Sequence, residues 1–297
     1  MGSSSLFPLR AGPTTPGSRP PAAPQIERPR LELSGRKLAL AFESLVGGSE
    51  EHGGIERYVA ALEAKSALFR EALGGGRARE IAPAAFGTLV AMIAPARRRA
   101  AAHLAGSAFE RLRERVVQLL ETIEDTASTD RRLAEFCAGF PDDRGHRWVR
   151  DLAAELLHNV DPERYPLMCR WVWDARIRTG ALREMWHGPD AEAALERVPD
   201  GYGTFLVLRE ELAGFLTANG VYRDVIHYAD LLTAQVYAGY ILEQAAGYLR
   251  VDFTAPADPL EHTRRLLGLD VLHPRGGARL KTSGADAPAA EGTPRTG

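Results

Sequence analysis

The sequence predicts an all-α fold, an irregular orthogonal bundle of about nine or ten helices in a single domain. Two observations support this prediction. Apolar residues recur at spacings of three and four along most of the chain, and glycines and prolines separate these stretches. Segments with the alternating polar and β-branched residues of a half-exposed strand are absent from the sequence.

The helices predicted in the first half of the chain begin and end at glycine and proline. Residues 37–46 precede a Gly-Gly pair, residues 55–73 precede a run of three glycines, and residues 83–93 lie between prolines. The clearest pattern covers 97–123, after Pro95, which suits the first turn of a helix. One apolar stripe of this helix contains Phe109, Leu112, Val116, Leu119, Leu120 and Ile123.

A helix over residues 166–187 is predicted to be the centre of the fold. This segment contains three of the four tryptophans, and the long helices 97–124 and 221–248 are expected to pack against it. Asp161-Pro162 and Pro166 predict a turn before it, and Thr179-Gly180 is a possible interruption. The other predicted helices cover 130–138, 147–160, 204–218, 221–249 and 258–267.

The two ends of the chain have the composition of disordered tails. Residues 1–30 and 274–297 are rich in proline, glycine and small polar residues and have few apolar residues to bury. The predicted organisation is therefore one helical domain, residues 31–273, between two tails.

Composition excludes several classes of protein. The net charge of −2 gives no general attraction to nucleic acid, and no apolar run is long enough to span a membrane. Two cysteines are too few for a disulfide scaffold and suit a reducing compartment, so we predict a cytoplasmic protein. Only three of the 37 basic residues are lysine, a bias typical of a GC-rich bacterial genome.

An acidic residue followed three positions later by histidine occurs three times in the sequence. On a helix such a pair shares one face, and two pairs with two further carboxylates form the di-iron site of ferritin-like bundles. One alternative is therefore a helical metalloenzyme, di-iron or mononuclear, with iron as cofactor. With 39 acidic residues and eight histidines, however, some of these pairs arise by chance. The predicted metal ligands are Glu155, His158, Glu184, His187 and His227.

The tryptophans of residues 166–187 suggest a protein-binding face instead. Trp171 and Trp173 are two positions apart, so on a helix they would point in nearly opposite directions. Either the helix is central and buried on several sides, so that both belong to the core, or one of them is exposed or lines a groove. Tryptophan beside arginine is typical of binding hot spots. The predicted partner-binding residues are Arg170, Trp173, Arg176 and Trp186.

The sequence contains no nucleophile elbow, P-loop, dinucleotide fingerprint or C-x-x-C pair. We therefore expect a non-enzymatic accessory or interaction protein, of adaptor or assembly type, that binds a protein partner. A weaker alternative is a nucleic-acid-associated regulator that uses Arg97, Arg98 and Arg99. Glutamates on the same predicted helix would pair with these arginines, and nucleic acid is not the expected partner.

Overall fold

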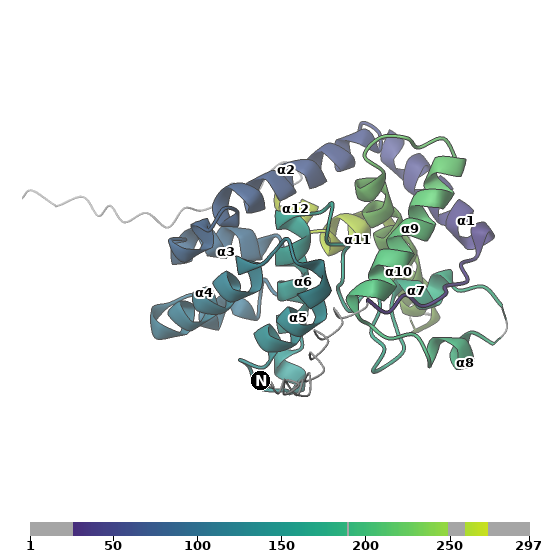
Figure 1. The fold of residues 1–297 in the computed structure, drawn as a ribbon. Helices are drawn as coiled ribbons and strands as arrows, with labels where there is room; N and C mark the ends of the chain where they lie inside the picture. Colours follow the sequence, from purple (N-terminus) through teal and green to yellow (C-terminus); the bar gives the residue numbers. More distant parts are fainter. Residues whose placement is uncertain (1–25, 189, 249–258, 273–297) are drawn as a thin grey trace, which may run out of the picture.

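The computed structural model describes residues 26–188, 190–248 and 259–272, and these residues form an all-α fold (Figure 1). The described residues contain no strand; their only β pairings are two isolated bridges. The predicted fold class is therefore confirmed. The helices are α1 (Gly35–Glu50), α2 (Glu56–Leu73), α3 (Pro83–Ala91), α4 (Gly106–Glu121), α5 (Thr129–Cys137), α6 (Trp148–Val160), α7 (Ala181–Met185), α8 (Ala191–Leu195), α9 (Tyr202–Ala218), α10 (Val225–Tyr248), α11 (Pro259–Leu266) and α12 (Leu269–Leu272).

Local signals set many of the helix ends. The Ser34 side chain caps α1 by accepting a hydrogen bond from the Lys37 backbone N–H. Pro83 is the first residue of α3, where its missing N–H leaves no hydrogen bond unmade. α2 ends at Gly74, as the glycine run predicts.

The centre of the fold is α6. Every residue of α6 except Arg150 is buried, because α2, α4 and α5 pack around it. Figure 1 shows α6 enclosed by these helices, with α2 running above it. A helix buried on all sides must also bury its polar residues, which then need partners.

Two long helices, α2 and α10, contact most of the other helices. α2 contacts α3 and α6 on one side of the fold and α10 on the other. α10 in turn packs against α1, α7, α9 and α11 (Figure 1). The N-terminal end of α10 therefore lies beside α2, while its later residues approach α7 and α11.

The prediction of a central helix over 166–187 is wrong. These residues form an irregular segment that ends in the short helix α7. Asp174 and Thr179 pair as an isolated bridge, and the Ala181 N–H donates to the Trp171 carbonyl at 2.9 Å. At Gly180 φ is 131°, and a Cβ there would lie 2.6 Å from the Val172 carbonyl oxygen, so only glycine allows the chain to turn back this closely.

The predicted helix 97–123 is also too long. Residues 97–105 form turns and a 3-10 helix (Ala100–His103), and α4 begins only at Gly106, whose φ is 55°. A left-handed residue cannot continue an α-helix, so the apolar stripe starts after it. Four residues of the stripe, Phe109, Leu112, Val116 and Leu119, are buried as predicted. The other two, Leu120 and Ile123, are half-buried against the core, and Ile123 lies beyond the end of α4.

Most of both predicted tails lies outside the described residues. Residues 26–30, inside the predicted N-terminal tail, contact the domain: Ile26 packs against the core, and Arg28 forms an ion pair with Glu210 of α9. Among the helices of the described residues, none combines the length and the hydropathy that a membrane span requires.

Candidate functional site

Two of the four predicted partner-binding residues lie in the core. Trp173 is fully buried, and its indole Nε1 donates to the Val198 carbonyl at 3.1 Å. Trp186 is also buried, and its carbonyl accepts from Lys37 Nζ at 3.3 Å. On a regular helix the two side chains would point in different directions, but in the irregular segment that replaces it both face the core. In this conformation neither residue is available to a partner.

The other two predicted partner-binding residues reach the surface. Arg170 is partly buried, and its Nη2 lies 2.7 Å from Asp151 Oδ2. Its backbone N–H donates to the other oxygen of Asp151 at 2.8 Å, so α6 holds this arginine at two points. Arg176 is 78% exposed, and its nearest carboxylate, Asp142, is 3.9 Å away.

Arg170 and Trp171 line an open groove of about 490 Å³. Its walls come from residues 170–179, from α10 and α11, and from the chain around Pro95. The ring of Trp171 lies 5.8 Å from that of Tyr237 on α10, measured between centroids. Ile177 and Ile241 also line it and are 49% and 37% exposed. We call this surface the Arg170–Trp171 groove.

Basic side chains outnumber acidic ones along the groove. Each arginine has a carboxylate partner: Arg147 pairs with Asp174 at 2.7 Å, and Arg97 pairs with Asp270 at 2.8 Å. The partners of Arg97 and Arg265 do not line the groove themselves. The charged lining residues are four arginines, Arg97, Arg147, Arg170 and Arg265, and two aspartates, Asp151 and Asp174.

Two buried donors of groove residues have no hydrogen-bond partner among the described residues. They are Nε1 of Trp171 and Nε of Arg170. Both atoms can only donate. A buried donor without an acceptor costs about 1–3 kcal/mol. Both atoms are almost inaccessible to solvent, so a ligand that brings acceptors meets them only after neighbouring side chains move.

Arg176 lines an adjoining pocket of about 460 Å³. Arg147, Arg170 and Asp174 belong to both pockets, so the Arg147–Asp174 ion pair lies between them. A ligand that extends past this pair would reach Arg176.

The predicted metal ligand Glu155 forms a buried ion pair with a lysine. Lys65 Nζ on α2 donates to Glu155 Oε2 at 2.7 Å and to the Leu267 carbonyl at 2.9 Å. Both side chains are almost completely buried. Burial raises the pKa of the Glu155 carboxyl, although the charge of Lys65 opposes this shift.

The side chain of His158 also has partners within the fold. Its Nδ1 lies 2.8 Å from the Tyr165 carbonyl, and its Nε2 forms an ion pair with Asp230 Oδ2 of α10 at 3.2 Å. Burial lowers the pKa of His158, but the charge of Asp230 and the Tyr165 carbonyl outweigh burial and raise it. The Nδ1 contact has hydrogen-bond geometry, whereas the Nε2 contact with Asp230 is an ion pair whose angles fall outside that geometry.

The remaining predicted ligands do not join these two. Glu184 is half-buried on α7, where burial raises its pKa against the charge of Lys37, and His187 is exposed. No group of three or more His, Cys, Asp or Glu side chains that could hold a metal ion occurs in the part of the chain that the structure describes. The five residues predicted to bind iron therefore do not converge.

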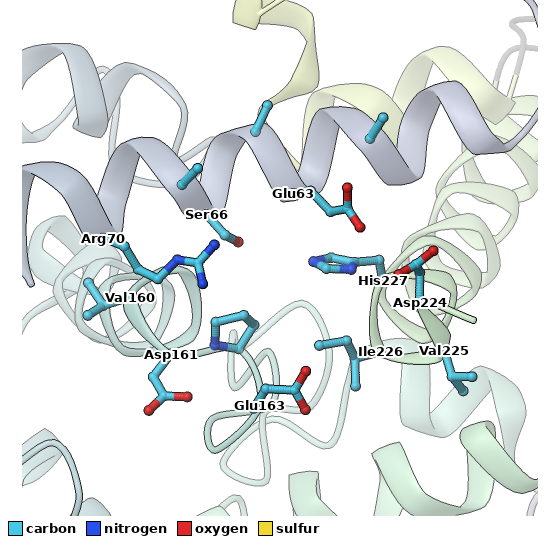
Figure 2. Close-up of a pocket in the computed structure, with 14 residues that line it drawn as sticks. Glu63, Ser66, Arg70, Val160, Asp161, Glu163, Asp224, Val225, Ile226 and His227 are labelled. Atoms are coloured by element: carbon cyan, nitrogen blue, oxygen red, sulfur yellow. The ribbon is translucent and has the colours of Figure 1, made fainter. Parts of the chain in front are cut away.

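His227 differs from the other histidines of the acid-x-x-His pairs. It lies in the first turn of α10 and lines a separate pocket between α2, the turn after α6 and the start of α10 (Figure 2). Asp224, its partner in the sequence pattern, precedes the helix with φ 52°, and its carbonyl accepts from the His227 N–H at 2.9 Å.

The arginines of the nucleic-acid alternative do not form one basic helix. Residues 97–99 lie in turns before the 3-10 helix. Arg97 pairs with Asp270 and lines the groove, and Arg99 donates to the Gly145 carbonyl at 3.3 Å.

Sequence reasoning identified Arg170 and His227 but missed the residues that complete their surroundings. Tyr237, Ile241 and Arg265 reach the groove from α10 and α11, more than 60 residues away in sequence. Only their exposure in the fold distinguishes them from other residues of amphipathic helices.

Comparison of the chain with protein-family models, with curated proteins and with solved structures finds no match.

Proposed function

We propose that this protein is a cytoplasmic, non-enzymatic interaction protein whose Arg170–Trp171 groove binds an acidic, partly apolar segment of a protein partner. The observation that carries the proposal is the combination of two exposed isoleucines and four arginines in one groove. The two cysteines are free, which suits a reducing compartment.

The apolar part of the partner segment would contact Ile177 and Ile241. These are two of the few large apolar side chains that the described surface exposes, and they line the same groove. Covering a side chain of this size contributes about 1.5–3 kcal/mol when burial is complete. One leucine or phenylalanine side chain of the partner, lying against Ile177 and Ile241, would provide that cover.

The acidic part would meet the arginines. Four arginines line the groove, and although each is paired with one carboxylate, every guanidinium has five N–H donors, so a partner carboxylate would accept from those that the ion pairs leave unused. Carboxylate and backbone carbonyl oxygens are also the acceptors that Trp171 Nε1 and Arg170 Nε need. Arg176 would contact a longer segment beyond the Arg147–Asp174 pair.

Selection of random peptides displayed on phage against the full chain tests the proposal directly. We expect enrichment of sequences that place Asp or Glu beside Leu, Phe or Trp. The dissociation constant of a selected peptide should rise about tenfold in Ile177→Asp and in Ile241→Asp. Leu40→Asp, at an exposed leucine of α1 outside the groove, is the matched control and should leave it unchanged.

In cells, a photo-crosslinking amino acid at position 177 should capture a partner that the same amino acid at position 40 does not. An absence of enriched peptides would contradict the proposal. So would enriched peptides whose binding ignores both isoleucine variants, because the groove would then not be the site.

A further inference from the structure

A second pocket lies between α2, the turn after α6 and the start of α10. Its volume is about 980 Å³, within the range of small-molecule sites. Figure 2 shows that three elements face it: α2 from above, residues 160–163 from below, and the first turn of α10 from the side.

His227 is a polar side chain held in this pocket without a partner. It is only 8% exposed, and Figure 2 shows its ring directed into the cavity. Neither ring nitrogen has a hydrogen-bond partner among the described residues. A neutral imidazole offers one donor and one acceptor, and because both nitrogens are almost inaccessible to solvent, a ligand pairs with one of them only after a neighbouring side chain moves aside. In contrast, His158 uses both nitrogens within the fold.

Four carboxylates and one arginine line the pocket. In Figure 2 the carboxylates of Glu63 and Asp224 lie near His227, and that of Glu163 lies on the lower wall. Asp161 also lines the pocket but pairs with Arg164. The guanidinium of Arg70 lies at the opposite end from His227 and extends toward the cavity.

We propose that this pocket binds a small zwitterion, a molecule that carries an ammonium and a carboxylate on a short linker. The ammonium lies among Glu63, Asp224 and the acceptor nitrogen of His227, and the carboxylate pairs with Arg70. An amino acid or a short peptide has this chemistry. A diamine would bring a positive charge to Arg70, and a dicarboxylate would bring a negative charge to Glu63, so both should bind less tightly.

Trialanine is a suitable probe, because its two charges are separated and its side chains are small. Binding to the full chain is measured by isothermal titration calorimetry beside N-acetyl-trialanine, trialanine amide and putrescine. We expect trialanine to bind most tightly and the loss of either charge to weaken binding about fivefold. Both Glu63→Gln and Arg70→Gln, exposed positions on α2, should weaken trialanine binding by a similar factor.

Glu71→Gln is the matched control, since Glu71 is an exposed glutamate of α2 that does not line the pocket. The His227→Leu variant should lose at least about tenfold in affinity while remaining folded. Ile177→Asp should leave trialanine binding unchanged, so failure of this proposal is distinguishable from failure of the groove.

Three outcomes would overturn the inference. The first is that none of the four probes binds, so that only water occupies the pocket. The second is that putrescine binds as tightly as trialanine, which would make the site one for cations alone. The third is that trialanine binds equally to the Glu63, Arg70 and Glu71 variants, which would place its site elsewhere.

Discussion

Replacement of Lys65 by methionine is expected to destabilise the fold by about 3–5 kcal/mol. Lys65 Nζ donates to Glu155 Oε2 and to the Leu267 carbonyl, and both charged side chains are buried. Methionine fills the space of the lysine stem but supplies no charge. Glu155 would keep only the Asn159 amide, 3.4 Å from Oε2, because Oε1 already has no partner among the described residues.

For a domain of this size each kcal/mol shifts the melting temperature by about 2–4 °C, so the expected loss is about 6–20 °C. Circular dichroism during thermal and urea unfolding measures it. Arg79→Met is the matched control, because Arg79 forms an ion pair of the same kind with Glu121 but both side chains are exposed. That variant should lose no more than about 1 kcal/mol.

The pH dependence of the stability loss, and a double variant, test whether an unpaired Glu155 carboxylate causes the loss. Burial raises the pKa of Glu155, so at low pH the carboxyl is buried without charge and needs the lysine less. The loss in Lys65→Met should therefore shrink as the pH falls from about 7 toward about 4.5. Lys65→Met combined with Glu155→Leu should recover most of the stability, since no unpaired charge remains. A loss below about 1 kcal/mol in Lys65→Met, or a double variant no better than the single one, would refute this reasoning.

Three further predictions rest on single contacts. Gly180→Ala should lower the free energy of urea unfolding by several kcal/mol, because a Cβ would lie 2.6 Å from the Val172 carbonyl oxygen. Gly214→Ala in α9, with open space around it, is the control and should raise the free energy of unfolding by about 0.5–1 kcal/mol. Equal effects of the two substitutions would contradict the tight turn at Gly180. The raised pKa of His158 means that its ion pair stabilises the fold fully below about pH 6.5 and that this contribution is lost as the pH rises through the folded pKa. The melting temperatures of Asp230→Asn and the native chain should thus differ more at about pH 6 than at about pH 9, and a constant difference would exclude a charged pair. In the ligand-free protein His227→Leu should raise the melting temperature, because it removes a buried ring with no partner among the described residues; a lower value would show that water or an undescribed residue already pairs with it.

The helix ends could be predicted from the sequence wherever a neighbouring residue sets them. The glycine run after Leu73 and the proline at position 83 act within one turn of the chain, so short-range reasoning places both ends. The same reasoning failed at 166–187. There the conformation depends on the approach of Gly180 to the Val172 carbonyl and on the hydrogen bond from Ala181 to Trp171. These contacts link residues eight to ten positions apart, beyond the reach of helical periodicity.

The candidate sites were predictable only in part, for a related reason. Arg170 and His227 have informative neighbours in the sequence, but the rest of each site arrives from other helices. Trp171 gains its role from Tyr237, and His227 from Glu63 and Arg70, which the packing of α2 and α10 brings near. No pattern in a single sequence encodes these distances.

The acid-x-x-His pattern of α6 has a different explanation from metal binding. Polar residues at spacings of three and four form a stripe along this buried helix, and each meets a partner on another element. We infer that the stripe selects which elements pack against α6, since a shifted element would leave a buried charge unpaired. The Arg170–Trp171 groove depends on this arrangement, because Asp151 of α6 holds Arg170 at the edge of the groove. The matched pairs are Asp151 with Arg170, Glu155 with Lys65, and His158 with Asp230.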